Sequence, residues 1–278
     1  MFIFAGMGVM LPSMLHAQAS GTAIDFEQIR VSYIYAAVMG SGTYKINERR
    51  ISMLRFPFSF TQRQMTQEQA GLKWELPVVL GYDALKYEDW FDRILEDELM
   101  TLTVLPGLEY QKPLNEFWTL KPFVNLGAGY DFTREETIFM GVLGFRALGT
   151  WLYEDHSELR VGASGRLAAE YQVQSYNTYR FSLFEGGLDY RRDAHFRIFS
   201  RATNAGVYYR AQLFVPQWKI GRNAFGNKDD LGFIHEIGGS IGFQDPHKIL
   251  GFAISRVRMG YKFGDGVRGW TIGTEFPF

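Results

Sequence analysis

The chain has 278 residues, and its 29 basic and 30 acidic side chains give a net charge of −1. This balance provides no positive field for a phosphate backbone, so the composition excludes a nucleic-acid-binding class. The absence of cysteine excludes disulfides and thiolate chemistry. Aromatic residues make up 16% of the chain, and 30 glycines stand against 9 prolines. Together with a mean hydropathy of −0.14, these proportions are typical of membrane barrels, whose strands are only half apolar.

The first 19 residues are predicted to be a secretory signal peptide. An apolar run closes on Ala17-Gln18-Ala19, which matches the small-residue pattern of a cleavage site. The run is too short and too rich in glycine to be a good spanning helix. No Lys or Arg precedes it, so the true start lies upstream or the basic region is missing. We expect cleavage after Ala19 and a mature barrel domain at 20–278; a buried N-terminal helix is the alternative.

No further apolar run of about 20 residues follows, which excludes spanning helices. Instead, segments of ten or more residues alternate between apolar and polar side chains, and turn signals divide them. Such a series predicts an all-β fold, a transmembrane antiparallel up-and-down β-barrel. We expect about twelve strands, with 10 or 14 as alternatives, at 27–39, 50–61, 70–84, 98–110, 116–131, 136–152, 157–173, 177–191, 195–216, 230–244, 249–263 and 266–278.

Two of these strands show the pattern most clearly. In 157–173, apolar residues such as Leu159 occupy one face and charged residues such as Arg160 occupy the other. Farther upstream, Trp118 and Tyr130 lie twelve residues apart on one strand. At about 3.3 Å per residue and a tilt near 45°, they bracket roughly the 25 Å apolar band of a membrane barrel. We therefore expect them to belong to the aromatic girdles.

The last segment resembles the membrane-insertion signal of outer-membrane β-barrels, with Trp270, Ile272, Phe276 and Phe278 as its residues. An exposed aromatic strand edge invites aggregation in a soluble protein, whereas a closed barrel has no free edge. We therefore expect 266–278 to close the barrel by pairing with 27–39. In that arrangement the four signal residues face lipid and Glu275 faces inward.

An even strand count places both chain ends on the periplasmic side. The connections expected outside the cell are long, and they lie at 40–49, 85–97 and 217–229. The turns expected in the periplasm are short, and they lie at 153–156, 192–194, 245–248 and 264–265. The connection at 62–69 does not fit, because it is longer than a periplasmic turn should be. In 195–216 the alternation slips near Ala205-Gly206, which predicts a β-bulge or two short strands.

Several stretches resemble the solitary outer-membrane autotransporter-like β-barrels of Gram-negative bacteria. They are Leu105-Pro106-Gly107-Leu108-Glu109-Tyr110, Pro113-Leu114, Trp118-Thr119-Leu120-Lys121-Pro122-Phe123, and Met259-Gly260-Tyr261-Lys262-Phe263 with Phe276-Pro277-Phe278. The resemblance implies a twelve-stranded translocator-type barrel without a passenger, and it brings no catalytic residues. Only Ser20 to Phe26 precede the first expected strand, and seven residues of helix reach about 10 Å. We expect that such a segment is too short to thread the barrel.

Inward-facing charges are the candidates for lining the lumen. They are Arg55, Lys73, Glu75, Lys121, Arg160, Arg166, Glu170, Glu236, Arg256, Arg258, Lys262 and Glu275, and Asp83, Glu109 and Glu158 share their phase. Eight are basic and seven are acidic. Two interpretations stay open. Either the charges line a narrow porin-like pore, which Arg256, Arg258 and Lys262 bias weakly toward anions, or they pair and close the lumen of a structural protein.

The alternative function is that of a lipase-type or protease-type enzyme at the outer rim, although we expect no enzymatic activity. His156-Ser157-Glu158 contains suitable residue types, but neighbours in a strand point to opposite faces and cannot form a triad by themselves. Asp229 and Asp230 lie near the predicted outer mouth, with His235 and Glu236. The alternation directs His235 away from the lumen, so a rim histidine is the simpler interpretation.

No metal or cofactor motif accompanies these residues. His195 and His247 lie alone in predicted inner turns, and the chain has no metal-ligand spacing and no phosphate loop. The expected partners are outer-membrane lipid, lipopolysaccharide and the barrel-assembly machinery. Nucleic acid is not expected as a partner, and the oligomeric state is left open.

Overall fold

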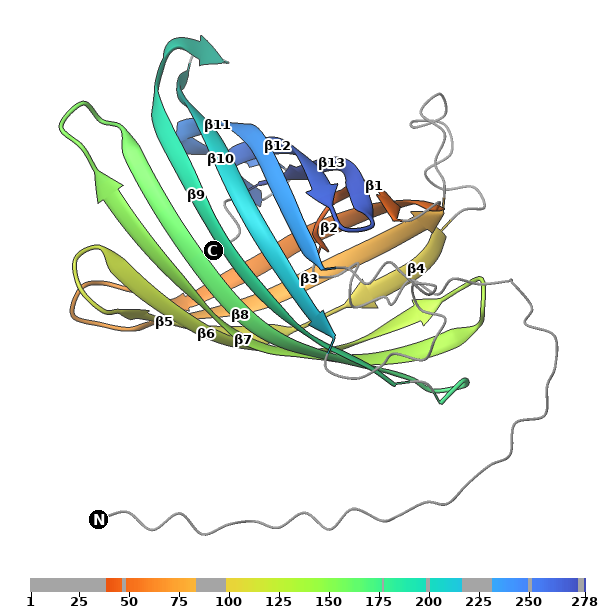
Figure 1. Cartoon of the computed structure of the whole chain (residues 1–278). Coiled ribbons are helices and arrows are strands. Elements are labelled where there is room, and N and C mark those ends of the chain that lie inside the picture. The colour runs from red at the N-terminus through yellow and green to blue at the C-terminus, as the bar shows by residue number, and fades with distance from the viewer. Residues whose placement is uncertain are drawn as a thin grey trace, which may run out of the picture.

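The structure is a computed structural model, and it describes residues 39–46, 49–83, 99–176, 178–198, 201–216, 232–249, 252–274 and 278. These residues form a closed antiparallel β-barrel with twelve strand positions (Figure 1). The predicted fold class, an all-β antiparallel barrel, is confirmed. The predicted signal peptide at 1–19 lies outside the described residues, and so does the predicted strand at 27–39 except for Met39.

The strands are consecutive along the chain. Their bounds are β1 (Gly42–Ile46), β2 (Arg49–Arg63), β3 (Gly71–Asp83), β4 (Leu99–Val104), β5 (Gly107–Pro113), β6 (Trp118–Asp131), β7 (Glu136–Leu152), β8 (Glu158–Gln172), β9 (Thr178–Ile198), β10 (Arg201–Pro216), β11 (Phe233–Ile249), β12 (Phe252–Gly264) and β13 (Val267–Gly273).

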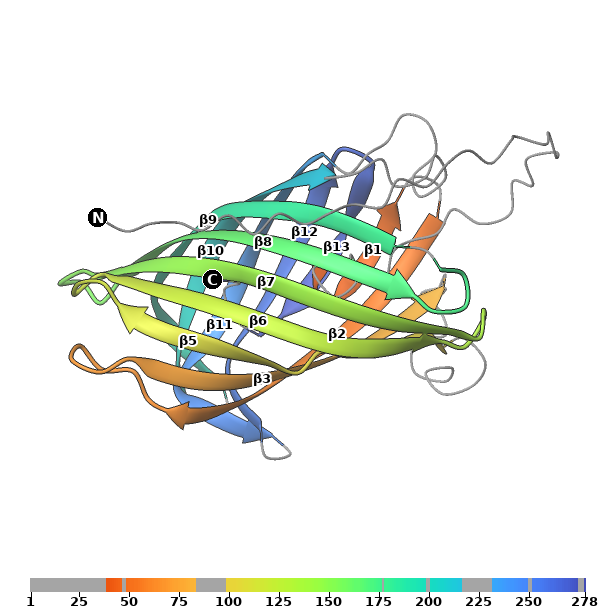
Figure 2. The same ribbon diagram turned by 90° about the horizontal axis from the view of Figure 1, so that it is seen from below.

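Apart from β4 and β5, each strand pairs with its neighbours in sequence, and β13 pairs with β1 to close the barrel. Strands β4 and β5 share one position between β3 and β6, because Pro106 has no N–H for the ladder. Across this gap the Leu105 N–H donates to the Pro77 carbonyl and the Leu126 N–H donates to the Pro106 carbonyl. The wall is therefore continuous. From below, β6, β7 and β8 lie side by side, with β11 to β13 behind them (Figure 2).

The closing strand differs from the prediction. β13 pairs with β1, with Thr43 opposite Trp270, and β1 in turn pairs with β2. The predicted partner at 27–39 is therefore wrong, and 40–49 is not a loop. Five residues are too few to reveal a period of two, which is why the pattern missed β1. With Gly42 as the first residue of the wall, 20–41 would span roughly 33 Å as a helix, so the expectation that the preceding segment is too short to thread the barrel no longer follows.

Two predicted turns lie inside strands. β9 continues to Ile198 and β11 continues to Ile249, so the turns predicted at 192–194 and 245–248 are wrong. Both sites are rich in polar residues, which imitate turn signals where a strand extends beyond its apolar part. His195 and His247 consequently belong to β9 and β11 rather than to turns.

The pairing of β9 with β10 is irregular between Ala202 and Thr203, a few residues before the bulge predicted at Ala205-Gly206. The turn at 264–265 lies at the opposite end from the one predicted. Asp265 accepts a hydrogen bond from the Phe233 N–H at 2.9 Å, so the turn lies beside the start of β11. Because successive connections alternate between the two ends, this end also holds the connections at 84–98 and 217–232. We name it the long-loop end and the opposite one the short-turn end.

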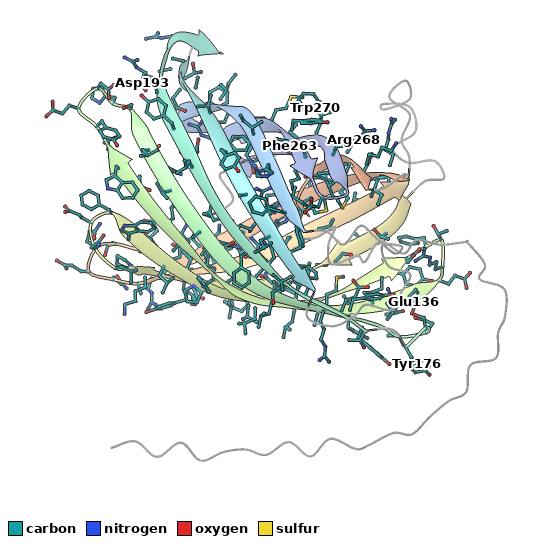
Figure 3. All side chains as sticks on the ribbon, in the orientation of Figure 1. Glu136, Tyr176, Asp193, Phe263, Arg268 and Trp270 are labelled. Atoms are coloured by element: carbon teal, nitrogen blue, oxygen red, sulfur yellow. The ribbon has the colours of Figure 1, made fainter. Side chains whose placement is uncertain are left out.

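The two faces of the wall differ sharply. Large apolar side chains cover the outer face, with aliphatic residues such as Leu126, Leu143 and Val207 at mid-height. Exposed aromatic residues accompany them, some at mid-strand, such as Phe145, and some near the long-loop end, such as Phe263 and Trp270 (Figure 3). The inner face carries the charged and amide side chains that are buried. It also carries a cluster of buried apolar side chains that includes Met53, Phe123, Phe181 and Phe214, so apolar and polar contacts fill the interior together.

Candidate functional site

The predicted lumen residues lie on the inner face. The structure places there Arg55, Lys73, Glu75, Lys121, Arg160, Arg166, Glu170, Glu236, Arg256, Arg258 and Lys262, together with Glu109 and Glu158. Glu275 and Phe276 lie outside the described residues, and so does the side chain of Asp83. Trp270 and Ile272 are half exposed on the outer face.

Glu236 on β11 is the centre of the largest polar cluster. Its carboxylate forms ion pairs with Arg210, with Arg258 at 3.0 Å and with Lys262 at 3.7 Å. The hydroxyls of Tyr208 and Thr271 each donate to Oε1 at 2.8 Å. Register explains the arrangement, because Glu236 lies directly opposite Arg210 on β10 and Lys262 on β12. Strands β10 to β13 thus meet on one carboxylate.

Glu185 on β9 extends the cluster around the wall. Its carboxylate pairs with Arg166 and lies 3.4 Å from Arg210, so Arg210 joins the two carboxylates. Ser164 donates to Glu185 at 2.8 Å and Gln212 donates at 2.6 Å. These two residues are its direct neighbours in register on β8 and β10. We call the set Arg166, Glu185, Arg210, Glu236 and Lys262 the interior network.

A second group lies on the opposite part of the wall. Arg146 on β7 reaches Glu75 on β3 at 3.1 Å and also pairs with Glu109 on β5. Its guanidinium lies 4.2 Å from the ring centroid of Phe123. Because β3 and β7 are not neighbours, this arginine bridges strands through the barrel interior rather than along the wall. Arg55 on β2 lies near enough to interact with it electrostatically.

Toward the short-turn end the charges pair locally. Arg191 lies 2.6 Å from Asp189 and 3.2 Å from Glu158, and Arg160 lies 2.7 Å from Glu158. Arg256 donates to the Ser240 hydroxyl at 2.7 Å. The predicted lumen charges are therefore largely occupied with one another.

Sequence reasoning missed several members of these groups. They are Arg146, Glu185, Asp189, Arg191, Tyr208, Arg210 and Gln212. The sequence contains a signal for most of them, because Glu185, Asp189 and Arg191 share one phase and Arg210 and Gln212 share another. From the sequence, the strands at 177–191 and 195–216 are not divided into inner and outer faces, so their inward residues are not among the candidates. The strand at 136–152, which contains Arg146, alternates too poorly to show which side chains face inward.

The described residues that flank the wall in sequence, Met39 and Phe278, both lie in the barrel interior. Phe278 is only 6% exposed and packs with Tyr208 and Leu148. A Cβ on the inward-facing Gly162 would lie 2.3 Å from the Phe278 ring, and Lys121 donates to the main-chain oxygen of Phe278 at 3.3 Å. In both views the C-terminal end lies within the outline of the barrel (Figures 1 and 2).

The prediction that Phe278 faces lipid is therefore wrong. β13 ends at Gly273, five residues before Phe278, and alternation constrains side chains only while a strand stays in the ladder. At the other end the chain leaves the wall at Gly40, whose φ of +88° favours glycine. The Met39 carbonyl accepts from Lys262 at 2.9 Å, and the Tyr44 hydroxyl donates toward the same carbonyl at 3.2 Å.

The enzyme candidates do not assemble into a triad. In the turn after β7, His156 has a φ of +60° and is exposed, while Ser157 donates through its hydroxyl to Asp155 at 2.6 Å. That hydrogen bond lowers the pKa of the Asp155 carboxyl. Glu158 points inward to its arginines. The three consecutive residues thus serve the turn and the wall.

His235 lies on the outer face near the long-loop end. Its Nδ1 is 2.6 Å from the Tyr209 hydroxyl, and its ring centroid lies 4.5 Å from that of Phe233 and 5.3 Å from that of Phe263. Asp229 and Asp230, the acids predicted beside it, lie outside the described residues. Within the part of the chain that the structure describes, no three His, Asp or Glu residues gather as a metal site.

Within the same described part, no helix is both long and apolar enough to cross a membrane. No protein-family model matches the chain, and no curated protein is similar to it in sequence. A solved structure, LpxR from Salmonella typhimurium, is similar in shape, with 8% sequence identity and a TM-score of 0.40. The similarity covers 82% of this chain and 88% of that chain. At this score it supports no inference about what the present chain binds or does.

Proposed function

We propose that the chain is an integral outer-membrane β-barrel protein whose lumen is closed at rest. The outer face supports the location, because a continuous cover of exposed aliphatic and aromatic side chains matches the apolar core of a bilayer. The longest connections share one end of the barrel. Since outer loops are long and periplasmic turns short, that end faces outward and both chain ends belong to the periplasmic side.

The burial of the interior network is the observation that carries the closed lumen. Glu236, Lys262 and Gln212 are 0% exposed, although they lie on the inner face toward the long-loop end. Residues that line an aqueous pore would be accessible from its water. The buried network along one part of the wall, and the ion pair of Arg146 with Glu75 across the interior, therefore favour a structural or tightly gated barrel over an open porin.

The resemblance to passenger-less autotransporter-like barrels stays a prediction. With the wall beginning at Gly42, chain length no longer argues against a segment that enters the lumen. Met39 itself lies in the barrel interior, where its carbonyl accepts a hydrogen bond from Lys262.

Planar-bilayer recording tests the closed lumen. We expect the purified wild-type barrel to show no stable open level, because buried ion pairs and apolar side chains fill its interior. The double substitution Arg146→Ala and Arg166→Ala removes two bridging side chains and should produce steady ohmic openings. Arg268→Ala, on the outer face, should behave as the wild type. A stable open level in the wild type would refute the proposal.

A rim enzyme is the second candidate, and the hydrogen bond between His235 and Tyr209 is the observation that favours it. Because neither a nucleophile nor a carboxylate contacts this pair within the described residues, we expect no hydrolysis of phospholipid or peptide by the wild-type protein. Release of fatty acid or peptide that disappears in His235→Ala would instead establish the enzyme. The assay uses the detergent-purified barrel with mixed lipid micelles and casein.

A further inference from the structure

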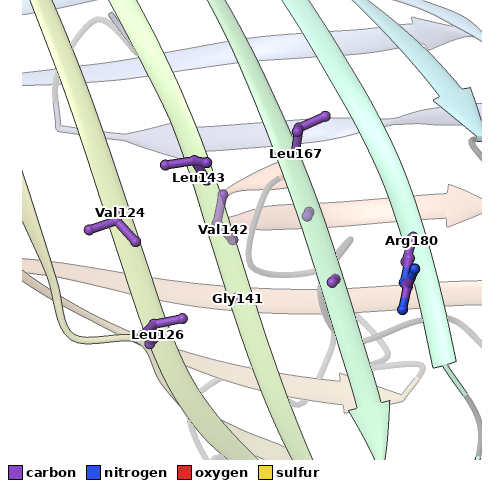
Figure 4. A pocket seen from close by; sticks show the side chains of 9 residues that line it. Val124, Leu126, Gly141, Val142, Leu143, Leu167 and Arg180 are labelled. Atoms are coloured by element: carbon purple, nitrogen blue, oxygen red, sulfur yellow. The ribbon is translucent and has the colours of Figure 1, made fainter. Parts of the chain in front are cut away.

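A shallow groove crosses the outer face of β6, β7, β8 and β9 (Figure 4). It has a volume of about 300 Å³ and is open to the surroundings. Its lining is apolar except for Arg180. The groove is separate from the interior network, since it lies on the opposite side of the wall.

The pairing register explains why the wall is hollow here. Leu126, Gly141, Ala169 and Arg180 lie opposite one another on successive strands, so they form one row across the sheet. Gly141 and Ala169 are the smallest members, and they form the floor. The next row toward mid-barrel holds Val124, Leu143 and Leu167, whose side chains are exposed and form one bank.

The row on the other side holds Phe139 and Tyr171, which lie opposite each other and are both exposed, but they do not line the groove. The row from Leu126 to Arg180 covers three strand spacings of about 4.8 Å, which gives the groove a length of roughly 14 Å. This is a slot for a narrow, flexible apolar chain rather than for a protein side chain.

Arg180 places a positive charge at one end of this slot. It is exposed on the outer face, two residues after the start of β9 at the long-loop end. Among the described residues, no carboxylate forms an ion pair with it. A lipid-facing arginine is costly in a bilayer unless it lies near the interface or meets an anion. An apolar slot that ends in a cation is complementary to an anionic amphiphile.

We propose that the groove binds one acyl chain of lipid A, the phosphorylated, acylated glycolipid of the outer leaflet, with a phosphate against Arg180. This inference rests on the proposed outer-membrane location and orientation, which put the long-loop end and therefore Arg180 in the outer leaflet. Arginine suits the phosphate because its planar fork donates two parallel hydrogen bonds. The acyl chain lies along the floor, over Gly141 and Ala169.

Two substitutions test the groove, one in its floor and one at its charged end. A Cβ at Gly141 would meet Leu126 Cδ2 at 3.3 Å, so Gly141→Leu fills the floor without touching the inner face. Arg180→Gln removes the charge and keeps the length of the side chain. We expect each to weaken binding of hexa-acylated diphosphoryl lipid A at least tenfold, as measured by native mass spectrometry of the full barrel.

Matched controls lie outside the slot. Gly186→Leu adds the same side chain on β9, outside the groove, where a Cβ would lie 3.9 Å from the Gly162 carbonyl oxygen. Arg268→Gln removes an exposed arginine from the long-loop end of β13 (Figure 3). We expect both to stay within twofold of the wild type. Equal affinities for all five proteins would overturn the proposal.

The identity of the lipid is tested by competition. Dephosphorylated lipid A keeps its acyl chains, so Gly141→Leu should still weaken its binding, whereas Arg180→Gln should leave that binding unchanged. Stronger binding of phosphatidylglycerol than of lipid A would overturn the outer-leaflet assignment. Failure of the wild-type barrel to insert into vesicles would refute the membrane location itself. Insertion with unchanged lipid binding in both groove variants would refute the groove alone.

Discussion

Replacement of Glu236 by alanine is expected to lower the free energy of unfolding by roughly 3–5 kcal/mol, the range typical for breaking a buried ion pair. The substitution leaves Arg210, Arg258 and Lys262 without their shared carboxylate. Lys262 and Glu236 are both 0% exposed, so water cannot take over the lost contacts. Urea unfolding of the barrel in lipid vesicles, followed by tryptophan fluorescence, measures the loss.

Glu158→Ala provides the matched control. Glu158 also pairs with two arginines, Arg160 and Arg191, but its side chain is 20% exposed near the short-turn end. Water can replace part of these contacts, so we expect a cost of about 1 kcal/mol or less. Equal losses for the two variants would contradict a special role of the buried network. Glu236→Gln should fall between them, because the amide keeps hydrogen bonds and loses the charge.

The fold followed from the sequence wherever a strand was long enough to repeat its period. β8 spans 15 residues and alternates throughout, and its predicted range agrees with the structure. β1 has five residues, which hold little more than two periods and cannot be told from a loop. Turns were harder to predict from the sequence where strands project beyond the apolar band, because polar residues there no longer distinguish a strand from a turn. β9, which extends to Ile198, shows this effect.

The candidate site was predictable as a face but not as a set of contacts. Alternation alone put Glu236, Arg258 and Lys262 on the inner side of their strands. Which of them meet depends on register, since Glu236 lies opposite Arg210 and Lys262 only in the observed pairing. A shift by one residue would move every side chain to the other face, and a shift by two would exchange partners. Periodicity within one strand contains no information on that shift.

The same limit explains why the sequence did not reveal Arg146, whose partners lie on β3 and β5. Its contact with Glu75 passes through the interior between strands that are not neighbours. Such a contact depends on barrel radius and on side-chain length, neither of which a one-dimensional pattern encodes. The balance of charges was visible from the sequence, but the closure of the lumen was only one of two open interpretations. The observed burial of Glu236 and Lys262 favours that interpretation.

The seam between β1 and β13 should be the most sensitive part of the wall to substitution. β1 contributes five paired residues on each side, so few ladder hydrogen bonds close the barrel there. Gly269 lies opposite Tyr44 across this seam. A Cβ at Gly269 would lie 2.1 Å from the Thr43 carbonyl oxygen and 2.7 Å from Tyr44 Cα. Because both are backbone atoms, a side chain fits only if the two strands separate.

Gly269→Val is therefore expected to open the seam and to cost about 2–4 kcal/mol, since each lost ladder hydrogen bond costs about 1 kcal/mol. The fraction of protein that keeps its compact, heat-modifiable mobility in SDS gels should fall. Gly239→Val is the matched control, because the nearest atom to its Cβ is the Gly206 carbonyl oxygen at 3.6 Å, an ordinary contact. Valine itself favours strands, so the control should fold as well as the wild type. If both variants fold equally, the wall does not depend on the close approach of β1 and β13, and β1 would be a dispensable part of the closure.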